Sequence, residues 1–341
     1  MKVEICKDSG KWDAYVDASP QANNYHRWVW REVIHDTYGH EGYYLAASDN
    51  GKLQGVLPMT LISSRLFGRS LVSVPFFSYG GPLTTTPEAH QALLAEAVKI
   101  GRELGTDRLE LRHGSNGGNG DWHDSSAKVT MLVRMPAKLE ELWNGLSTGM
   151  RNKIRSARKR GLSSQVGGIE MLDVFYRIFA TNMRNLGTPV YPRSWFENLC
   201  RRNPETVKIL TVLDEGQPVA SGIVSVFRDT VEWPWSATMS EARRKYAAVF
   251  LYWSLLEWAA QNGYRTVDFG RCTRGSGNWE FKRHWNCEEV PLHWHYWLGA
   301  GARVPEMHAD NPRYRLAVRV WQRLPLGVAN WLGPRVVRCI P

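Results

Sequence analysis

The sequence lacks the features that mark secreted, zinc-binding or membrane-spanning proteins. Its five cysteines are scattered through 341 residues without a C-x-x-C pair, so it predicts neither a disulfide framework nor a zinc site. No stretch reaches the ~18 apolar residues that a membrane-spanning helix needs. Residues 1–16 carry three carboxylates and no apolar run, so we expect no signal peptide. These absences favour a reduced, cytoplasmic compartment.

Acidic residues are in the minority. Lys and Arg number 43 and Asp and Glu 33, which gives a formal net charge of +10. This balance favours anionic partners, namely nucleic acid, nucleotide-linked substrates or acidic lipid headgroups, without choosing between them. With 43% hydrophobic residues over this length, the chain can bury a large core, and we expect about two domains.

The first part of the chain predicts an α/β arrangement from its apolar spacing. The expected elements are helices over residues 23–38 and 87–104 and strands over residues 43–47, 53–62, 71–74 and 108–112. The Asn50-Gly51 pair between the first two strands is a strong signal for a tight hairpin turn. Residues 113–124, rich in glycine and asparagine, are interpreted as an exposed connection.

The second part of the chain repeats this plan. A hairpin turn is predicted at Gly216 as at Gly51, and the segment G-T-D-R-L-E-L from Gly105 matches G-Y-R-T-V-D-F from Gly263. The two separations differ by only a few residues, which favours duplication of an α/β unit over chance similarity of ordinary hairpins. The predicted domains cover residues 1–137 and 138–300, and a tail covers residues 301–341.

A glycine-rich, basic stretch follows the second of these segments. Residues 268–285 read D-F-G-R-C-T-R-G-S-G-N-W-E-F-K-R-H-W. Glycines let backbone N–H groups approach an anion, a helix N-terminus adds positive potential, and arginines can hold a phosphate or oxyanion bidentately. The spacing fits a plain turn between two buried elements equally well. An anion site here would use Arg271, Arg274, Gly275 and Gly277.

The most basic run lies between the two copies. A helix is predicted over residues 150–160, with Ser147 as its N-cap and Gly161 after its end. Its six cations have no carboxylate in the run, so they repel one another unless an external polyanion neutralises them. Because of their i, i+4, i+7 spacing, one face carries Arg151, Arg155 and Arg158. We expect phosphate or RNA contact there rather than a merely solvated face.

Four segments carry a family resemblance. They are R-x-x-R-K-R-G at the end of the basic helix, T-P-V-Y-P from Thr188, the block over residues 268–285, and P-L-H-W-H-Y-W-L from Pro291. Over essentially the whole chain, the sequence resembles the FemAB-like proteins. The closest likeness is to the FemAB-related group found with exosortase/PEP-CTERM exopolysaccharide systems.

The resemblance implies two tandem GNAT-like domains, the fold of acetyl-CoA N-acetyltransferases, each a mixed sheet flanked by helices. Characterised FemAB relatives move an amino acid from aminoacyl-tRNA onto an amine of a peptidoglycan precursor. By resemblance, Lys282 stabilises the tetrahedral oxyanion and Phe281 lies near the acceptor end of the RNA. A preorganised cation at a developing oxyanion is worth about two to three orders of magnitude in rate. Tyr191 and Arg193, in the T-P-V-Y-P-R loop, are further substrate-binding candidates.

Some positions depart from a CoA-dependent enzyme. The stretch R-R-K-Y-A-A over residues 243–248 stands where such an enzyme has R/Q-x-x-G-x-G/A, and Tyr246 occupies the first glycine position. A tyrosine crowds the approach of a pyrophosphate, so we expect weak or no CoA binding. Asp268 is a candidate for the base that accepts the amine proton. The alternative is a structural role, in which its carboxylate caps the backbone or pairs with an arginine. His293 and His295 are interpreted as sheet residues, and no metal is predicted.

The tail is predicted to carry a basic amphipathic helix with Pro312 in its first turn. One face would hold Ala317, Val320, Trp321 and Leu324, and the other Arg315, Arg319 and Arg323. Such a helix either lies on an anionic membrane surface or docks on the protein.

These features predict a cytoplasmic N-acyl or aminoacyl transferase, peripheral to the inner membrane face. Its acceptor would be an amine of an anionic envelope precursor, of peptidoglycan or exopolysaccharide. No bound cofactor is expected, and aminoacyl-tRNA or acyl-CoA would serve as co-substrate. Two alternatives stay open: an acyl-CoA-dependent N-acyltransferase in exopolysaccharide assembly, and a non-catalytic module that binds nucleic acid or membrane.

Overall fold

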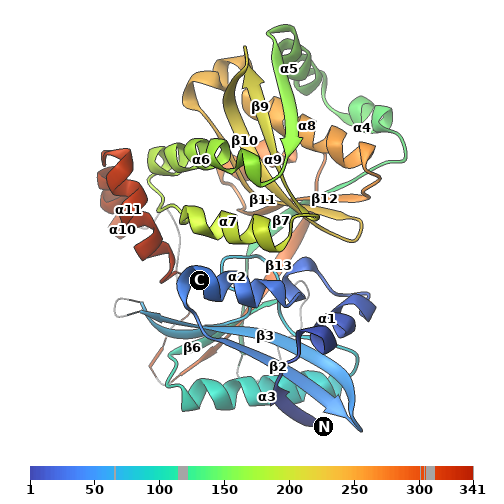
Figure 1. Cartoon of the computed structure of the whole chain (residues 1–341), viewed down its shortest axis with the longest axis vertical. Coiled ribbons are helices and arrows are strands. Elements are labelled where there is room, and N and C mark those ends of the chain that lie inside the picture. The colour runs from blue at the N-terminus through green and yellow to red at the C-terminus, as the bar shows by residue number, and fades with distance from the viewer. Residues whose placement is uncertain (65–66, 114–121, 300, 303, 305–311, 341) are drawn as a thin grey trace. The chain divides into compact units, whose positions relative to one another are not determined.

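The chain forms two compact units (Figure 1). The computed structural model describes residues 1–64, 67–113, 122–299, 301–302, 304 and 312–340. The first unit comprises Met1–Lys128, Pro291–Met307 and Val336–Pro341, and the second Val129–Val290 and His308–Arg335. Strands β7 (Trp122–Arg134) and β13 (Glu288–Leu298) contribute residues to both units. Most of the connection expected over residues 113–124 lies outside the described residues.

The first unit is a mixed sheet covered by helices. Its strand order is β1-β2-β3-β4-β6-β13-β7, with β5 paired to β3. The β4 and β6 strands are parallel, and β1 to β4 are antiparallel to their neighbours in the chain. The elements are β1 (Lys2–Ile5), α1 (Ser9–Ala18), α2 (Val29–Tyr38), β2 (Gly42–Asp49), β3 (Lys52–Ser64), β4 (Gly68–Val72), β5 (Leu83–Thr84), α3 (Pro87–Glu103) and β6 (Arg108–His113).

The β2–β3 hairpin shows how this sheet buries both faces. Its turn residues Asn50 and Gly51 both have positive φ, as a tight hairpin requires, so the predicted hairpin is confirmed. Side chains alternate along a strand, so Leu45 packs in the core shared with α3. Its neighbour Tyr44 turns to the opposite face, 4.8 Å from the ring of Trp12 in α1.

The helix predicted over residues 23–38 is wrong in its first turns. Asn24–His26 form a separate 3₁₀ turn, and α2 begins only at Val29. Asn23 and His26 close this turn as a capping box, in which each side chain bonds to the other residue's backbone N–H. These side-chain bonds satisfy the backbone locally, so the chain does not continue as one helix.

The second unit is also a mixed sheet with helices on both faces (Figure 1). Its strand order is β7-β12-β11-β10-β9-β8, in which β11 and β12 are parallel. The elements are α4 (Leu139–Gly145), α5 (Thr148–Lys159), β8 (Leu162–Gly167), α6 (Leu172–Leu186), α7 (Arg193–Arg202), β9 (Val207–Asp214), β10 (Gln217–Phe227), β11 (Thr230–Thr238), α8 (Ala247–Gln261), β12 (Thr266–Thr273) and α9 (Gly277–Arg283). The α/β architecture expected from the sequence is confirmed.

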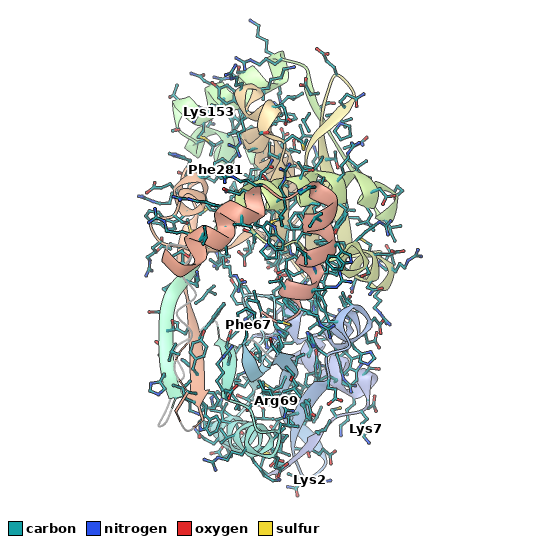
Figure 2. All side chains as sticks on the ribbon, turned by 90° about the vertical axis from the view of Figure 1, so that its left-hand side faces the viewer. Lys2, Lys7, Phe67, Arg69, Lys153 and Phe281 are labelled. Atoms are coloured by element: carbon teal, nitrogen blue, oxygen red, sulfur yellow. The ribbon has the colours of Figure 1, made fainter. Side chains whose placement is uncertain are left out.

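Two helices of the tail, α10 (Pro312–Gln322) and α11 (Leu326–Val337), face the viewer in Figure 2. Val318 packs where α6 ends at Gly187, and Gln322 donates to the carbonyl of Asn185 at 3.2 Å. The predicted helix is confirmed, and the face predicted to be apolar is not the one that meets α6. Val320 is exposed, because the residues at helical spacing that meet α6 are Val318 and Gln322. Within the described part of the chain, no helix has the length and hydropathy to cross a bilayer.

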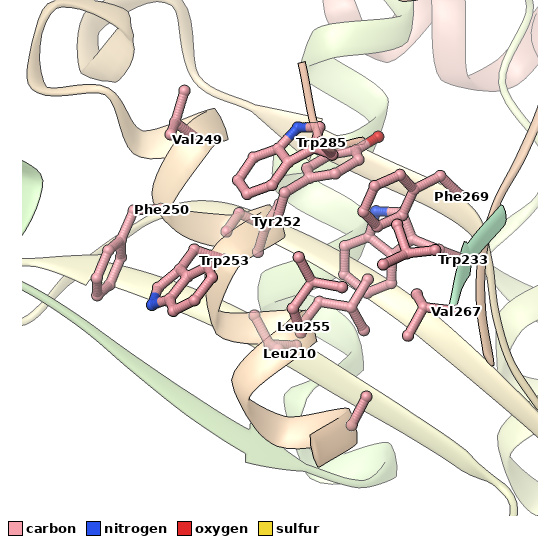
Figure 3. Packing of buried hydrophobic residues seen from close by; sticks show 14 of the residues in the cluster. Leu210, Trp233, Val249, Phe250, Tyr252, Trp253, Leu255, Val267, Phe269 and Trp285 are labelled. Carbon is pink, nitrogen blue, oxygen red and sulfur yellow. The ribbon is translucent and has the colours of Figure 1, made fainter. Parts of the chain in front are cut away.

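Aromatic packing dominates the core beneath β12 (Figure 3). Tyr252 of α8 stacks on Trp285 with ring centroids 5.9 Å apart, and Phe269 of β12 packs edge-on to Tyr252 at 4.8 Å. All three are buried, as is Trp233 of β11. This rigid cluster fixes where β12 and the helix after it lie relative to α8.

Candidate functional site

Strands β11 and β12 run side by side only where they begin. Residues 230–232 pair with residues 266–268, and the ladder ends at Asp268. At this point β11 bulges, because Trp233 and Pro234 together stand opposite Val224 of β10. Proline has no N–H to offer a neighbouring strand. Because β11 and β12 separate here, the carbonyl groups of β12 after Asp268 can accept hydrogen bonds from side chains.

The side chain of Lys282, on α9, lies at the end of β12, where β11 and β12 have separated. The residue is only 2% exposed, and its Nζ donates to the carbonyl oxygens of Gly270 at 2.8 Å and Arg271 at 3.3 Å. Burial lowers the pKa of Lys282, because the charged form is deprived of hydration. An ammonium has three donors, so two carbonyls leave one N–H for a further acceptor. The oxyanion role implied by the resemblance stays a prediction.

Asp268 holds the backbone of the same turn. Its buried carboxylate accepts hydrogen bonds from the hydroxyl of Thr130 and from the N–H of Gly270 at 2.7 Å. Gly270 has a φ of +76°, a conformation that favours glycine. These contacts give Asp268 a structural task, and its action as a base remains a prediction. Thr130 was not singled out from the sequence, since it precedes Asp268 by 138 positions.

A buried thiol, Cys272, and a half-buried one, Cys287, also lie near Lys282. Cys287 donates from Sγ to the carbonyl oxygen of Lys282 at 3.3 Å, and burial raises the pKa of Cys287 to about 12. The electrostatic influence of Cys272 and Asp268 reaches Lys282 as well. Sequence reasoning did not select these cysteines, because neither belongs to a spaced pair. They make the surroundings of the ammonium weakly polar.

The glycine-rich loop is held at its edge by a carboxylate. Glu289 of β13 accepts from Arg274 at 2.6 Å and from the indole N–H of Trp279. Both glycines of the predicted anion site, Gly275 with φ +77° and Gly277, have open space where a Cβ would lie. The loop can therefore admit a ligand close to its backbone. Anion binding by this loop, with Arg271 half-buried on β12, is still a prediction.

The aromatic residues near the loop belong mainly to the core. Phe281 is half-buried and packs edge-on to Tyr252 at 5.0 Å. Trp233, Trp235 and Trp285 are buried, and Trp279 is half-buried. Among these rings, Phe281 and Trp279 are the ones with surface left to meet a substrate.

The T-P-V-Y-P-R loop joins α6 to α7 through ion pairs. Arg193 lies 2.8 Å from Asp173 of α6 and 2.6 Å from Glu197 of α7. The ring of Tyr191 lies 5.8 Å from that of Trp195 and 6.2 Å from that of Trp235. The guanidinium is thus engaged within the protein, and substrate binding by Tyr191 and Arg193 stays a prediction.

The basic helix is confirmed as α5, with Ser147 as its N-cap and Gly161 after its end. The expectation that its cations lack carboxylate partners is wrong for Arg158, which pairs with Glu257 of α8. This pair could not be predicted from the sequence, because its members are 99 positions apart. Arg155 lies over the ring of Trp143 at 5.2 Å, and Arg151 donates to the carbonyl of Asn144 at 3.4 Å.

The loop before α8 is strained at the position where CoA-dependent enzymes carry glycine. Tyr246 has a φ of +62°, in the left-handed region that tyrosine rarely adopts. Its ring lies 5.4 Å from the guanidinium of Arg160, which also donates to the carbonyl oxygen of Arg244. A glycine here would lack the ring and would adopt the left-handed conformation freely.

The first unit has an equivalent of the site around Asp268, and an ion pair fills it. Its β4–β6 ladder also spans three residue pairs and ends at an acidic residue, Glu110, as the β11–β12 ladder ends at Asp268. Arg112 stands where the second unit has Gly270. Its guanidinium is buried, lies 2.7 Å from Glu110 and donates to the carbonyl of Phe77. In this copy an ion pair fills the end of the ladder, whereas in the second unit the side chain of Lys282 fills it.

Comparisons with known proteins match the second unit in sequence and both units in fold. A family described as "Acetyltransferase (GNAT) domain" matches residues 148–283, which includes Asp268, the glycine-rich loop and Lys282. The match lies within the second unit and covers less than half of the chain. No curated protein matches the sequence.

Solved structures extend the likeness to both units. The crystal structure of FemX superposes with a TM-score of 0.68 at 15% identity over 93% of this chain and 100% of that one. The fold is a tandem GNAT-like fold. A tandem GNAT protein from the clavulanic acid biosynthesis pathway gives a TM-score of 0.53 at 12% identity over 89% and 100%. The C-terminal domain of a putative lysylphosphatidylglycerol synthetase from Agrobacterium fabrum gives 0.59 at 12% over 87% and 93%.

The two histidines of β13 bind a carboxylate within the first unit. His293 and His295 pair with Asp124, at 3.4 Å and 3.2 Å. Among the described residues, no group of three or more His, Cys, Asp or Glu side chains is arranged to hold a metal ion.

Proposed function

We propose that this protein transfers an acyl or aminoacyl group to the amine of a cell-envelope precursor, with the reaction at the end of β12 where Lys282 lies. The observation that carries the proposal is the position of Lys282. Its ammonium is buried, is held by two backbone carbonyls and keeps one N–H for another acceptor. A fixed cation in a water-poor site stabilises a developing oxyanion far more than a solvated one does.

The chemistry follows from what Lys282 can do. The acceptor amine attacks the carbonyl carbon of an ester or thioester donor, and a C–N bond forms as the carbonyl oxygen gains negative charge. Lys282 would donate its remaining N–H to that oxygen. When the intermediate collapses, the C–O or C–S bond breaks, and the amine proton leaves with the released hydroxyl or thiol. Asp268 or a substrate group would carry this proton.

We favour aminoacyl-tRNA over acyl-CoA as the donor. Tyr246 places a side chain, with Arg160 5.4 Å from its ring, at the position where a CoA-dependent enzyme carries a glycine for the pyrophosphate. The exposed arginines of α5 could instead meet a phosphate backbone, which is longer than one cofactor. The likeness to FemX and to a lysylphosphatidylglycerol synthetase domain is compatible with an envelope role, and the resemblance to the PEP-CTERM group makes exopolysaccharide assembly one setting.

The test is a transfer assay on the purified full chain. Labelled aminoacyl-tRNA and labelled acetyl-CoA would be offered separately with an extract of envelope precursors, and products would be identified by mass spectrometry. Lys282→Met should abolish most transfer. Lys208→Met is the matched control, because the Lys208 ammonium also donates to a backbone carbonyl, that of Pro204 at 2.9 Å, but is only half-buried. Equal loss in both variants, or no transfer from either donor, would contradict the proposal.

Acyl-CoA remains the second candidate donor. The loop before α8 is rich in cations, with Arg160 beside Arg244, and a tandem GNAT protein is among the similar structures. Transfer from acetyl-CoA alone would select this donor. Binding of RNA or vesicles without any transfer would favour the non-catalytic module.

A further inference from the structure

The outer faces of α10 and α11 are unusually apolar for a surface. Ten large hydrophobic residues are exposed in the described part of the chain, and four of them belong to these two helices. Leu316 and Trp331 are the most exposed of all, at 69% and 60%. Single exposed apolar residues are common, but four of them on two consecutive helices mark an interaction site. We call the outward residues the tail surface. They are Leu316, Val320, Val328, Trp331 and the exposed arginines Arg315, Arg319, Arg323, Arg335 and Arg338.

These helices are anchored on their other faces. In α10, Val318 packs at Gly187 and Gln322 bonds to Asn185. In α11, Ala329 is buried, and Gly333 lies so close to Val190 that an added Cβ would meet its backbone at 2.8 Å. The inward and outward residues therefore lie on opposite sides of each helix. The tail surface is presented by a docked element.

The charge around the tail surface has a single sign. Residues 312–340 contain no Asp or Glu, and the exposed charged side chains are Arg315, Arg319, Arg323, Arg335 and Arg338. The guanidinium of Arg335 lies over the Trp331 ring at 4.1 Å. Apolar side chains, a tryptophan and a rim of arginines are what an interfacial helix offers to headgroups and upper acyl chains.

We propose that the tail surface binds the face of an anionic phospholipid bilayer. A phosphate backbone alone would leave Leu316, Val320 and Trp331 in water. A second copy of this chain in a symmetric contact would bring arginines against arginines. A bilayer satisfies both sets of residues, because anionic headgroups pair with the guanidinium groups while apolar side chains enter below them. This surface shares no residue with the site around Lys282, so its test does not depend on the transfer reaction.

The experiment is co-sedimentation of the full chain with vesicles. One set contains phosphatidylcholine alone, and the other equal parts of phosphatidylcholine and phosphatidylglycerol. The charge variant is Arg315→Gln, Arg319→Gln and Arg323→Gln, and the apolar variant is Leu316→Ser, Val320→Ser and Trp331→Ser. The matched control, Lys7→Gln, Arg69→Gln and Arg265→Gln, removes the same net charge at exposed positions outside the tail. Lys7 and Arg69 are labelled in Figure 2.

We expect the native chain to sediment with the anionic vesicles and less so as salt rises. Partitioning of the charge variant should fall about fivefold per arginine, and the apolar variant should fail to bind at high salt as well. The control should bind as the native chain does. The proposal is overturned if the native chain stays in the supernatant, or if the control weakens as much as the charge variant. It is also overturned if the apolar variant instead splits a dimer in analytical ultracentrifugation, which would make the tail surface a self-association face.

Discussion

The Nζ atom of Lys282 lies 2.8 Å from the carbonyl oxygen of Gly270, so the end of strand β12 orients the ammonium of helix α9. This contact depends on the positive φ of Gly270 and on the bond from its N–H to Asp268. The carboxylate, the turn and the ammonium thus form one hydrogen-bonded chain. A defect in any member should misplace the cation, which makes the chain testable by substitution.

Lys282→Met should reduce turnover by about two to three orders of magnitude, because it removes the cation that would meet the oxyanion. Steady-state kinetics with the donor identified in the transfer assay would measure this. Lys282→Arg should not restore the rate, since a planar guanidinium cannot replace a compact ammonium held by two carbonyls. Circular dichroism must show a native fold in both variants, and unchanged turnover in Lys282→Met would remove the residue from the mechanism.

Stability should depend on pH through Lys282. Burial lowers the pKa of this residue from 10.5, so between the lowered pKa and 10.5 the unfolded chain binds more protons than the folded chain. The free energy of unfolding should therefore rise with pH in this window, and Lys282→Met should flatten the rise. Urea unfolding of the native chain and of Lys282→Met at several alkaline pH values measures the difference in this slope. An equal or steeper rise in the variant would show that the pKa of Lys282 is not lowered.

The α5 arginines should report on RNA binding. We expect the triple variant Arg151→Gln, Arg155→Gln and Arg158→Gln to lower affinity for aminoacyl-tRNA. For each phosphate that the helix no longer neutralises, the dependence of log affinity on log salt should flatten by about 0.7 to 0.9. Arg158→Gln alone is the internal control, because that guanidinium already pairs with Glu257. It should change the slope less than Arg155→Gln does. A slope unaltered in the triple variant would mean that α5 is only a solvated face.

Tyr246→Gly should make the loop before α8 more open to CoA. Glycine adopts the left-handed conformation freely and removes the ring beside Arg160. We expect isothermal calorimetry to show weak or no CoA binding to the native chain and tighter binding to this variant. Tyr246→Phe retains the ring and the backbone conformation, so it should behave as the native chain. Tight, stoichiometric CoA binding to the native chain would favour the acyl-CoA donor.

Breaking the Glu110–Arg112 pair should destabilise the first unit. Removing one partner of a buried ion pair costs about 3 to 5 kcal/mol, because it leaves an uncompensated charge. We expect Arg112→Met to lower the free energy of unfolding by that amount. Adding Glu110→Gln should recover part of the loss. Arg134→Met, which breaks an exposed pair with Glu288, should have little effect. Equal losses in the two single variants would mean that burial does not set the cost of this pair.

The sequence by itself determined the local elements and their duplication. The Asn50-Gly51 hairpin, the Ser147 cap and the helix end at Gly161 are set by the conformations that these few residues allow. The repeated segments at Gly105 and Gly263 predicted two copies, and the two ladders that end at Glu110 and Asp268 bear this out. The turns and caps depend on neighbours within a few positions, and the repeat can be read by comparing the two segments, so neither needs tertiary information.

Only the tertiary structure decided which groups meet. Thr130 reaches Asp268 across 138 positions and Glu257 reaches Arg158 across 99, and no local pattern links them. The tail helix turned Val318 inward and Val320 outward, because its register depends on where Gly187 lets it approach α6. Helical spacing fixes which residues share a face, but packing against another element chooses the face that is buried.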